Sequence, residues 1–378
     1  MSPFDSLASA HDAFWSFFAR GPAGFAAQFF IEPNLAAPSL APGGDLKHQQ
    51  QPPMLRFDCG HTDTSNGRLP TAASTVMRLV PELAGPQWLS NRFEHDDMTH
   101  RFKMYVPSGY HGEQLPMIVM LHGAQQDADD FAAGTEMNAS AEAQGFIVVY
   151  PEQSESANPL RCWNWFRSAD RMHDSGETAM VVALTREVMA TYNVDNSRVY
   201  VAGMSAGGAM AVNLVVTHPD LYAAAAIHSG VAFGVADEPL SALCAMNDGM
   251  GHIRLPETLC DGTYPRVVPL IVFHGDADNT VHPLNSSQIV AMSALLLGDP
   301  DGSRWPATTH VQNAENGHAY TRDIFHDRAG VSIGERWLVH GLGHAWSGGH
   351  PSGTYTDSRG PHATKEIVRF FGQFALPL

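Results

Sequence analysis

Residues 198–210 constrain the fold of this chain most, because they read as a buried strand, a sharp turn and a helix start. Val199, Tyr200 and Val201 are typical of a buried parallel strand, and an Ala-rich stretch follows the turn. Between them lies Gly-Met-Ser-Ala-Gly, residues 203–207. Glycines at this spacing let the strand and the helix pass closely, while the serine occupies a strained turn. The pattern predicts that Ser205 projects from the top of a sheet as a nucleophile, with an ordinary Gly-rich turn as the alternative.

The size and composition of the chain limit its fold class and its partners. The 378 residues are 44% hydrophobic, which is enough for the core of one large α/β domain with an appendage. A net charge of -17 argues against nucleic-acid binding, which depends on clustered Lys and Arg. The sequence has no apolar run long enough to span a bilayer, and its amino terminus does not resemble a secretory signal peptide. We therefore expect no transmembrane segment and a cytoplasmic location.

The cysteines and histidines show no spacing typical of a disulfide framework or a metal site. The four cysteines are Cys59, Cys162, Cys244 and Cys260. We expect reduced thiols, with a bridge between Cys244 and Cys260 as the alternative. The 20 histidines include no His-Glu-x-x-His pattern, so the sequence predicts neither a metal nor a cofactor.

The chain divides into three predicted parts. Residues 1–32 carry apolar side chains at roughly helical spacing, which predicts a helical segment that packs on the main domain or docks on an apolar surface. Residues 33–94 are rich in Pro, Gly and Gln, as in a linker or extension. Residues 95–378 form the predicted catalytic domain.

Strands alternate with helices along this third part. The alternation implies right-handed crossovers and a mainly parallel sheet with helices on both faces. Functional sites in such sheets lie beyond the carboxyl ends of the strands, so residues directly after strands are the candidates for chemistry. The predicted strands include 101–107, 116–121, 146–150, 199–201, 223–228, 269–273 and 337–340, and the predicted helices include 135–144, 177–192 and 363–374.

A serine nucleophile needs a base, and a histidine after the last predicted strand meets that need. His344 lies in the Gly-rich loop 341–349, from which an imidazole could reach over the top of the sheet. His340, within the strand, and His350, further into the loop, are its rivals.

The acid expected to orient this histidine follows the strand 269–273, in the string His-Gly-Asp-Ala-Asp. Asp278 is the predicted carboxylate, and Asp276 is a turn-forming neighbour whose carboxylate caps local backbone. The chain order serine, acid, histidine is that of α/β-hydrolases. Three motifs in this order, each after a strand, predict this fold.

The negative oxygen of a tetrahedral intermediate needs fixed backbone donors. One predicted donor is the amide of Ala206, directly after the nucleophile. The other is the amide of Ala124, in the loop after the strand 116–121. Gly123 in the same loop has the alternative interpretation of a simple turn glycine.

Together these motifs resemble the poly(3-hydroxybutyrate) depolymerase family of serine esterases, over roughly residues 95–375. The resemblance implies an α/β-hydrolase fold with Ser205, Asp278 and His344 as the catalytic triad. Ala124 stands where family members commonly carry a cysteine, so a disulfide or thiol role is absent there while the backbone donor remains. The matching strings are Leu-His-Gly (121–123), Arg-Cys-Trp-Asn-Trp-Phe (161–166), Gly-Met-Ser-Ala-Gly-Gly-Ala (203–209), His-Gly-Asp-Ala-Asp (274–278) and Gly-His-Ala-Trp-Ser-Gly-Gly (343–349), with further matches at 355–361 and in the last helix.

The resemblance also implies a polyester substrate. Secreted relatives usually append substrate-binding domains, which are not seen here, so we expect the intracellular branch that acts on amorphous storage granules. Residues 1–32 then become a candidate granule anchor, although packing on the main domain is favoured. Four aromatic residues fit either a shallow apolar groove for the polymer or plain core, and the last of them is the first choice for substrate contact: Trp163, Trp165, Phe166 and Trp346.

We therefore expect an ester hydrolase that cleaves poly(3-hydroxybutyrate) or its oligomers through an acyl-Ser205 intermediate, without metal or cofactor. A carboxylesterase for small esters, such as feruloyl or short acyl esters, is the alternative of the same class. A non-catalytic granule-surface protein that retains the fold is the alternative of another class, and a metallohydrolase is a third.

Overall fold

The computed structural model of the protein describes residues 85–256, 266–298, 307–312, 317–327, 330 and 332–377. The predicted helical segment 1–32 and nearly all of the predicted linker 33–94 lie outside the described residues. The end of that linker does not, because residues 87–94 belong to a strand, β1 (Gln87–His95). The folded domain therefore begins at least as early as residue 87, which corrects the predicted boundary at residue 95.

Strand β1 pairs antiparallel with β2 (Met98–Val106) through a tight turn at Asp96 and Asp97. Both turn residues have positive φ, 49° and 59°, as a two-residue hairpin of the primed type requires. Half-buried and exposed residues alternate along β1, as expected for an edge strand with one face in solvent.

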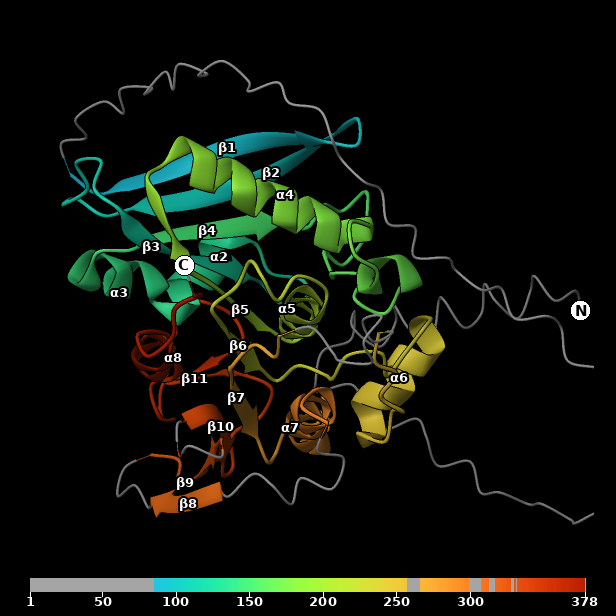
Figure 1. Ribbon diagram of the computed structural model, residues 1–378. Helices are drawn as coiled ribbons and strands as arrows, with labels where there is room; N and C mark the ends of the chain where they lie inside the picture. The colour runs from blue at the N-terminus through green and yellow to red at the C-terminus, as the bar shows by residue number, and fades with distance from the viewer. Residues whose placement is uncertain are drawn as a thin grey trace, which may run out of the picture. The chain divides into compact units, whose positions relative to one another are not determined.

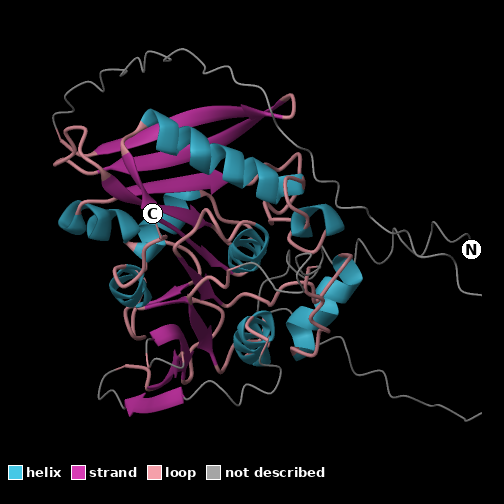
Figure 2. Cartoon of the chain, viewed as in Figure 1, coloured by secondary structure: helices cyan, strands magenta, loops and turns pink. Residues whose placement is uncertain are grey.

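The described strands form a ten-stranded sheet and a separate two-stranded one. Figure 1 and Figure 2 show the strands of the large sheet with helices packed beside them. The order in the large sheet is β1-β2-β4-β3-β5-β6-β7-β10-β9-β8. The strands from β4 to β10 in this order run parallel, and antiparallel strands flank them on both sides. The remaining bounds are β3 (Leu115–Leu121), β4 (Ile147–Glu152), β5 (Val194–Met204), β6 (Ala224–His228), β7 (Leu270–Gly275), β8 (Ala307–Gln312), β9 (Tyr320–His326), β10 (Ser332–Val339), β11 (Trp346–Ser347) and β12 (Thr356–Asp357).

Helices cover both faces of the sheet, so the predicted layering is confirmed (Figure 1). Successive residues of β5 point to opposite faces: Val199 and Val201 enter one core, and Tyr200 and Ala202 enter the other. One core contains residues of α4 (Gly176–Thr191), α5 (Ala206–Thr217), α6 (Pro239–Asp248) and α7 (Leu284–Leu296), and the other contains residues of α2 (Ala128–Thr135), α3 (Met137–Gln144) and α8 (Ala363–Phe371).

Helix α5, which follows Ser205, is buried from Ala206 to Val216. A helix that is apolar all round belongs in the interior, which explains why its sequence shows no polar face. None of the described helices is both long and apolar enough to cross a bilayer. The two described cysteines, Cys162 and Cys244, are free thiols, so Cys244 does not form the alternative bridge. Burial raises the pKa of the Cys162 thiol.

One buried carboxylate, that of Glu335 on β10, joins three elements. It accepts hydrogen bonds of 2.8–3.0 Å from Arg322 of β9, from Arg369 of α8 and from the indole N–H of Trp337. Burial acts to raise the pKa of the Glu335 carboxyl, but these donors outweigh it and hold the pKa below its usual value of 4.5. Glu335 is therefore ionised at neutral pH and forms ion pairs with two guanidinium groups.

Replacing Glu335 by Gln should destabilise the fold at pH 7 by about 2–3 kcal/mol, because two partly exposed arginines lose their charge partner. The folded pKa is the lower one, so this stabilisation is present above the unfolded pKa of about 4.5 and is lost as pH falls through the folded pKa. Urea unfolding of the native protein and of Glu335→Gln, at pH 7 and at about pH 3, measures this difference in the free energy of unfolding. Glu366→Gln is the matched control, because Glu366 pairs with the same Arg369 from a more exposed position and should contribute less than about 1 kcal/mol. Equal losses in the two variants would contradict the assignment.

Candidate active site

Ser205 lies in the sharp turn between β5 and α5, as predicted, with φ 55° and ψ -119°. A non-glycine residue in such a sparsely populated conformation stores about 1–3 kcal/mol of strain, which the surroundings must hold. The flanking glycines make the turn possible. A Cβ atom on Gly203 would lie 2.2 Å from the carbonyl oxygen of Gly207, and one on Gly207 would lie 2.0 Å from that of Leu121. Both positions therefore require glycine.

His344 and Asp278 form a hydrogen-bonded pair, with 2.7 Å between Nδ1 and Oδ2. The other carboxylate oxygen, Oδ1, accepts the backbone N–H groups of Thr280 and Val281, each at 2.9 Å. Because a carboxylate only accepts, Nδ1 of the ring carries the proton and Nε2 is left with a lone pair when the ring is neutral. The Asp278 side chain is fully buried, whereas the His344 side chain is 11% exposed.

The electrostatic surroundings keep Asp278 charged. Burial acts to raise the pKa of its carboxyl, but the charge of His344 and the hydrogen bonds from His274 and His344 hold that pKa far below its usual value. His274 Nε2 lies 3.4 Å from Asp278 Oδ2 and donates to the carbonyl oxygen of Val281 at 2.8 Å. No role was expected for His274, although it lies within the His-Gly-Asp-Ala-Asp string of residues 274–278.

His228, at the end of β6, links the Ser205 turn to the loop of His344. Its carbonyl oxygen accepts the backbone N–H of Ser205 at 2.9 Å, and its Nε2 accepts that of Ser347 at 3.0 Å. Burial, with smaller contributions from two nearby imidazoles, lowers the pKa of His228 to about 3, so the ring stays a neutral acceptor. Sequence reasoning missed this residue, whose only signal was its place at a strand end.

The sheet order brings the three predicted residues to one edge. Ser205 follows β5, Asp278 follows β7 and His344 follows β10, and these strands are neighbours with only β6 between β5 and β7. Parallel strands end at the same edge, where such folds hold their sites. The structure therefore places the hydroxyl-bearing turn and the imidazole–carboxylate pair at the predicted edge.

The rival residues have other partners. His340 Nδ1 lies 2.8 Å from Asp276 Oδ2, so the rival histidine His340 pairs with Asp276 and not with Asp278. Asp276 also accepts the backbone N–H of Gly341 at 2.6 Å, so its carboxylate binds backbone in the loop after β10 and not the local backbone that was predicted. His350 Nδ1 bonds to a serine hydroxyl two residues further on, at 2.7 Å. Of these histidines, only His344 pairs with Asp278.

Both predicted oxyanion donors, the backbone N–H groups of Ala124 and Ala206, are without an acceptor in the part of the chain that the structure describes. Gln126 holds the loop of Ala124, because its Oε1 accepts the N–H of Gly123 at 3.0 Å. A Cβ atom on Gly123 would lie 3.6 Å from that of Ser205, so the loop passes directly beside the serine. A contact of 3.6 Å is ordinary van der Waals contact, so the alternative interpretation of Gly123 as a turn glycine stays open.

The prediction that aromatic residues line a substrate groove is wrong. The exposed fractions of the four side chains are 5% or less, and all four belong to the two cores. Trp163 donates its indole N–H to the carbonyl oxygen of His122, and Trp346 donates to Thr364 Oγ1, each at 3.1 Å. The alternative of plain core holds for the full set: Trp163, Trp165, Phe166 and Trp346.

Known proteins share this sequence and fold. The family model described as "Esterase PHB depolymerase" matches residues 100–310. Poly(3-hydroxyalkanoate) depolymerase C of Paucimonas lemoignei is 29% identical over 250 residues, which cover 64% of this chain and 57% of that protein. Feruloyl esterase B of Neurospora crassa is 31% identical over 262 residues, which cover 65% of this chain and 82% of that protein.

Among solved structures, an acetyl xylan esterase from Aspergillus awamori aligns with a TM-score of 0.58 and 22% sequence identity. The alignment covers 76% of this chain and 99% of that one, and it shows a shared α/β-hydrolase fold. The family match covers more than half of the chain, from β2 through β8. The chain therefore belongs to the PHB depolymerase esterase family, a group of carboxylic ester hydrolases built on the α/β-hydrolase fold.

Proposed function

We propose that the chain hydrolyses carboxylic esters with Ser205 as nucleophile, His344 as general base and Asp278 as the carboxylate that orients the base. The observation that carries this proposal is the 2.7 Å bond between His344 and a buried, ionised Asp278. It lies at the edge of the sheet where the strained Ser205 turn also lies.

The roles follow from the geometry. His344 Nε2 takes the proton of Ser205 as the hydroxyl oxygen attacks the ester carbonyl carbon. The negative oxygen of the tetrahedral intermediate accepts hydrogen bonds from the free amides of Ala124 and Ala206. The same imidazole then protonates the leaving alcohol, and water attacks the acyl-Ser205 ester in a second round that frees the acid. Asp278 stabilises the imidazolium in both rounds without taking up its proton.

We propose poly(3-hydroxybutyrate) or its oligomers as the substrate. The family match and the depolymerase relative support this choice. The feruloyl and acetylxylan esterases among the relatives support the alternative, a carboxylesterase for small feruloyl or acetyl esters. We further propose that the enzyme works in the cytoplasm at the surface of storage granules, with residues 1–32 as a candidate anchor. The alternative of a non-catalytic granule protein requires an unreactive Ser205.

Replacing Ser205 by Ala should lower kcat/KM on a soluble chromogenic ester by about 10⁴-fold or more, because no other group supplies the nucleophile. A fluorophosphonate probe should label the native protein and not the variant. Ser156→Ala, at an exposed serine outside the site, is the control and should keep native activity and labelling. A native protein that neither turns over esters nor reacts with the probe would favour the non-catalytic granule protein. Turnover that survives in Ser205→Ala and is abolished by a chelator would establish a metallohydrolase.

Replacing Asp278 by Asn should lower kcat at neutral pH by about 10⁴-fold, because the amide allows the wrong imidazole tautomer. Asp276→Asn is the matched control: it breaks the neighbouring His340 pair, and kcat should stay within a few-fold of native. Because the pKa of Asp278 is depressed, the native carboxylate stays ionised at pH values below 3.8, the ordinary pKa of an aspartic acid. Loss of activity above that pH therefore reports protonation of a group other than Asp278. Similar kcat values in the two variants would refute the assignment.

Substrate choice is tested by comparing kcat/KM on amorphous poly(3-hydroxybutyrate), hydroxybutyrate oligomers, methyl ferulate and a short acetyl ester. We expect release of 3-hydroxybutyrate units and clearing of the polymer suspension, both abolished in Ser205→Ala. Fast turnover of ferulate or acetate esters without polymer clearing would replace the proposed substrate by the small-ester alternative and leave the mechanism intact.

A further inference from the structure

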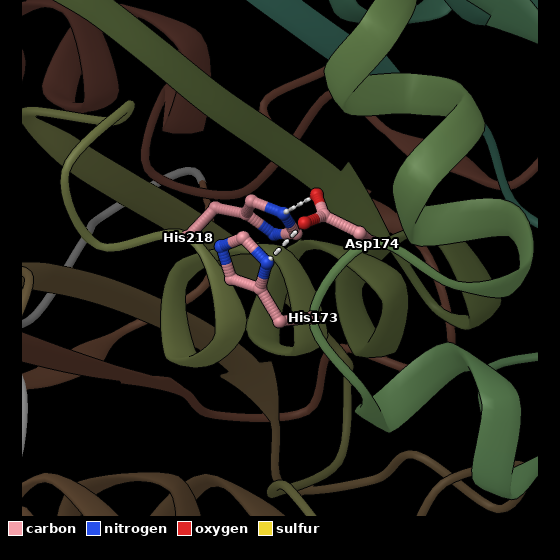
Figure 3. Close-up of side chains that lie close together, drawn as sticks. All are labelled: His173, Asp174 and His218. Atoms are coloured by element: carbon pink, nitrogen blue, oxygen red, sulfur yellow. Dashed lines mark ion pairs between the residues drawn. The ribbon is translucent and has the colours of Figure 1, made fainter. Parts of the chain in front are cut away.

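A second group of ligating side chains lies away from the proposed active site, in a cluster of His173, Asp174 and His218 (Figure 3). His173 and Asp174 lie in the loop between the short helix η2 (Ser168–Arg171) and α4, and His218 follows the last turn of α5. One ligand atom from each residue lies within 4.8 Å of the others. Helix α5 has 12 residues, so about 18 Å of helix separates this cluster from the serine turn.

The buried member of the cluster has a nitrogen without a partner. His218 is fully buried, and its Nε2 makes no hydrogen bond. Its Nδ1 lies 2.9 Å from Thr217 Oγ1, and that hydroxyl donates its own proton to the carbonyl oxygen of Asn213 at 2.7 Å. The hydroxyl can then only accept from the ring, so Nδ1 carries the hydrogen and Nε2 presents a lone pair.

This lone pair faces negative charge. Asp174 Oδ1 lies 3.6 Å from His218 Nε2, which is too long for a hydrogen bond. The other oxygen, Oδ2, lies 2.7 Å from His173 Nδ1, and the two imidazole rings stack with 4.2 Å between their centroids. Figure 3 shows the carboxylate beside both rings. A lone pair and a carboxylate that face each other repel unless a cation lies between them.

The surroundings include one feature that favours a cation and one that opposes it. The cluster lies at the carboxyl end of α5, where unpaired carbonyl groups carry partial negative charge. The opposing feature is positive charge, because Arg186 on α4 acts on His218 and Arg266 lines the same pocket as His173.

We propose that His173, Asp174 and His218 bind a divalent first-row transition metal, with Zn²⁺ as the best match. Two imidazoles and one carboxylate form a donor set typical of Zn²⁺, whereas Mg²⁺ and Ca²⁺ prefer oxygen ligands. With Zn–N bonds of about 2.0–2.1 Å, ligand atoms in a tetrahedral site lie about 3.4 Å apart. The ligand atoms lie up to 4.8 Å apart, so they would have to close by up to about 1.4 Å. That movement is open to the His173 and Asp174 side chains, which are 57% and 69% exposed. Water would complete the coordination.

A metal at this place would be structural. It would join the loop before α4 to the end of α5, and both helices pack on the same face of the sheet. The reacting ester lies at the other end of α5, so the ion takes no part in the proposed hydrolysis, and this inference stands whether or not the proposed function holds.

The test is isothermal titration calorimetry of Zn²⁺ into chelator-treated full-length protein, with thermal unfolding as a second readout. The native protein should bind one equivalent and unfold at a higher temperature with Zn²⁺, and Mg²⁺ should have neither effect. His173→Asn and Asp174→Asn change exposed side chains, and each should weaken binding by at least about tenfold. His111→Asn, at an exposed histidine elsewhere, is the control and should bind as the native protein does.

Thr217→Val keeps all three ligands and removes only the hydroxyl that orients His218. It should weaken Zn²⁺ binding by about 10- to 100-fold, as loss of an outer-shell partner typically does. The proposal is overturned if the native protein binds no Zn²⁺, or if Asp174→Asn binds it as tightly as the native protein. Binding that survives in Asp174→Asn and disappears in His344→Ala would place the ion at the catalytic imidazole and overturn it as well.

Discussion

The close approach of β3, β5 and α5 around Ser205 is the constraint on which the rest of the site depends. Glycine at 203 and 207 lets three backbone segments come closer than any side chain would allow. The serine between them adopts a strained conformation at the edge of the sheet, where it is 8% exposed. A helix buried from Ala206 to Val216 and strands buried on both faces hold that strain in place.

Several histidines lie around this turn, and their hydrogen-bond partners distinguish their roles. His344 is the only one of the three rivals for the base that pairs with the buried Asp278. His228 is held neutral by burial and joins the serine turn to the loop of the base. His122, whose pKa burial lowers to about 4, accepts the backbone N–H of Gln153 at 3.1 Å and fixes the start of the oxyanion loop. The proposed base therefore lies within a scaffold of neutral rings.

Much of this arrangement could be predicted from the sequence, because the central strands are short apolar runs and the candidate serine, aspartate and histidine follow such runs. The run at β3 predicted the end of that strand correctly, whereas β7 continues to Gly275, two residues beyond the predicted end at 273. Strand β1 was missed because alternate residues face solvent, and its polar face reads as linker. The two His–Asp pairs are separated by 66 and 64 residues in sequence, so spacing gives little means to choose between them. The burial of the carboxylate distinguishes the two pairs, because the Asp278 side chain is fully buried and that of Asp276 is 37% exposed.

The aromatic residues show a second limit of prediction from sequence, which concerns the direction of side chains. Sequence position placed Trp163 and Trp346 near the site, and both lie near it, but only coordinates show which way a ring points. Trp346 stacks on His228 with 5.0 Å between ring centroids, so it supports the site from within the core. The proposed polymer substrate therefore depends on family likeness, while the proposed hydrolytic mechanism depends on geometry.

The account is tested most directly by trapping the covalent intermediate. Rapid acid quenching of the native enzyme during turnover of a slowly deacylating ester, followed by mass spectrometry of its peptides, locates the acyl group. We predict one acyl group on the peptide that carries Ser205. An acyl group on another residue, or none while the ester is being hydrolysed, would contradict the account.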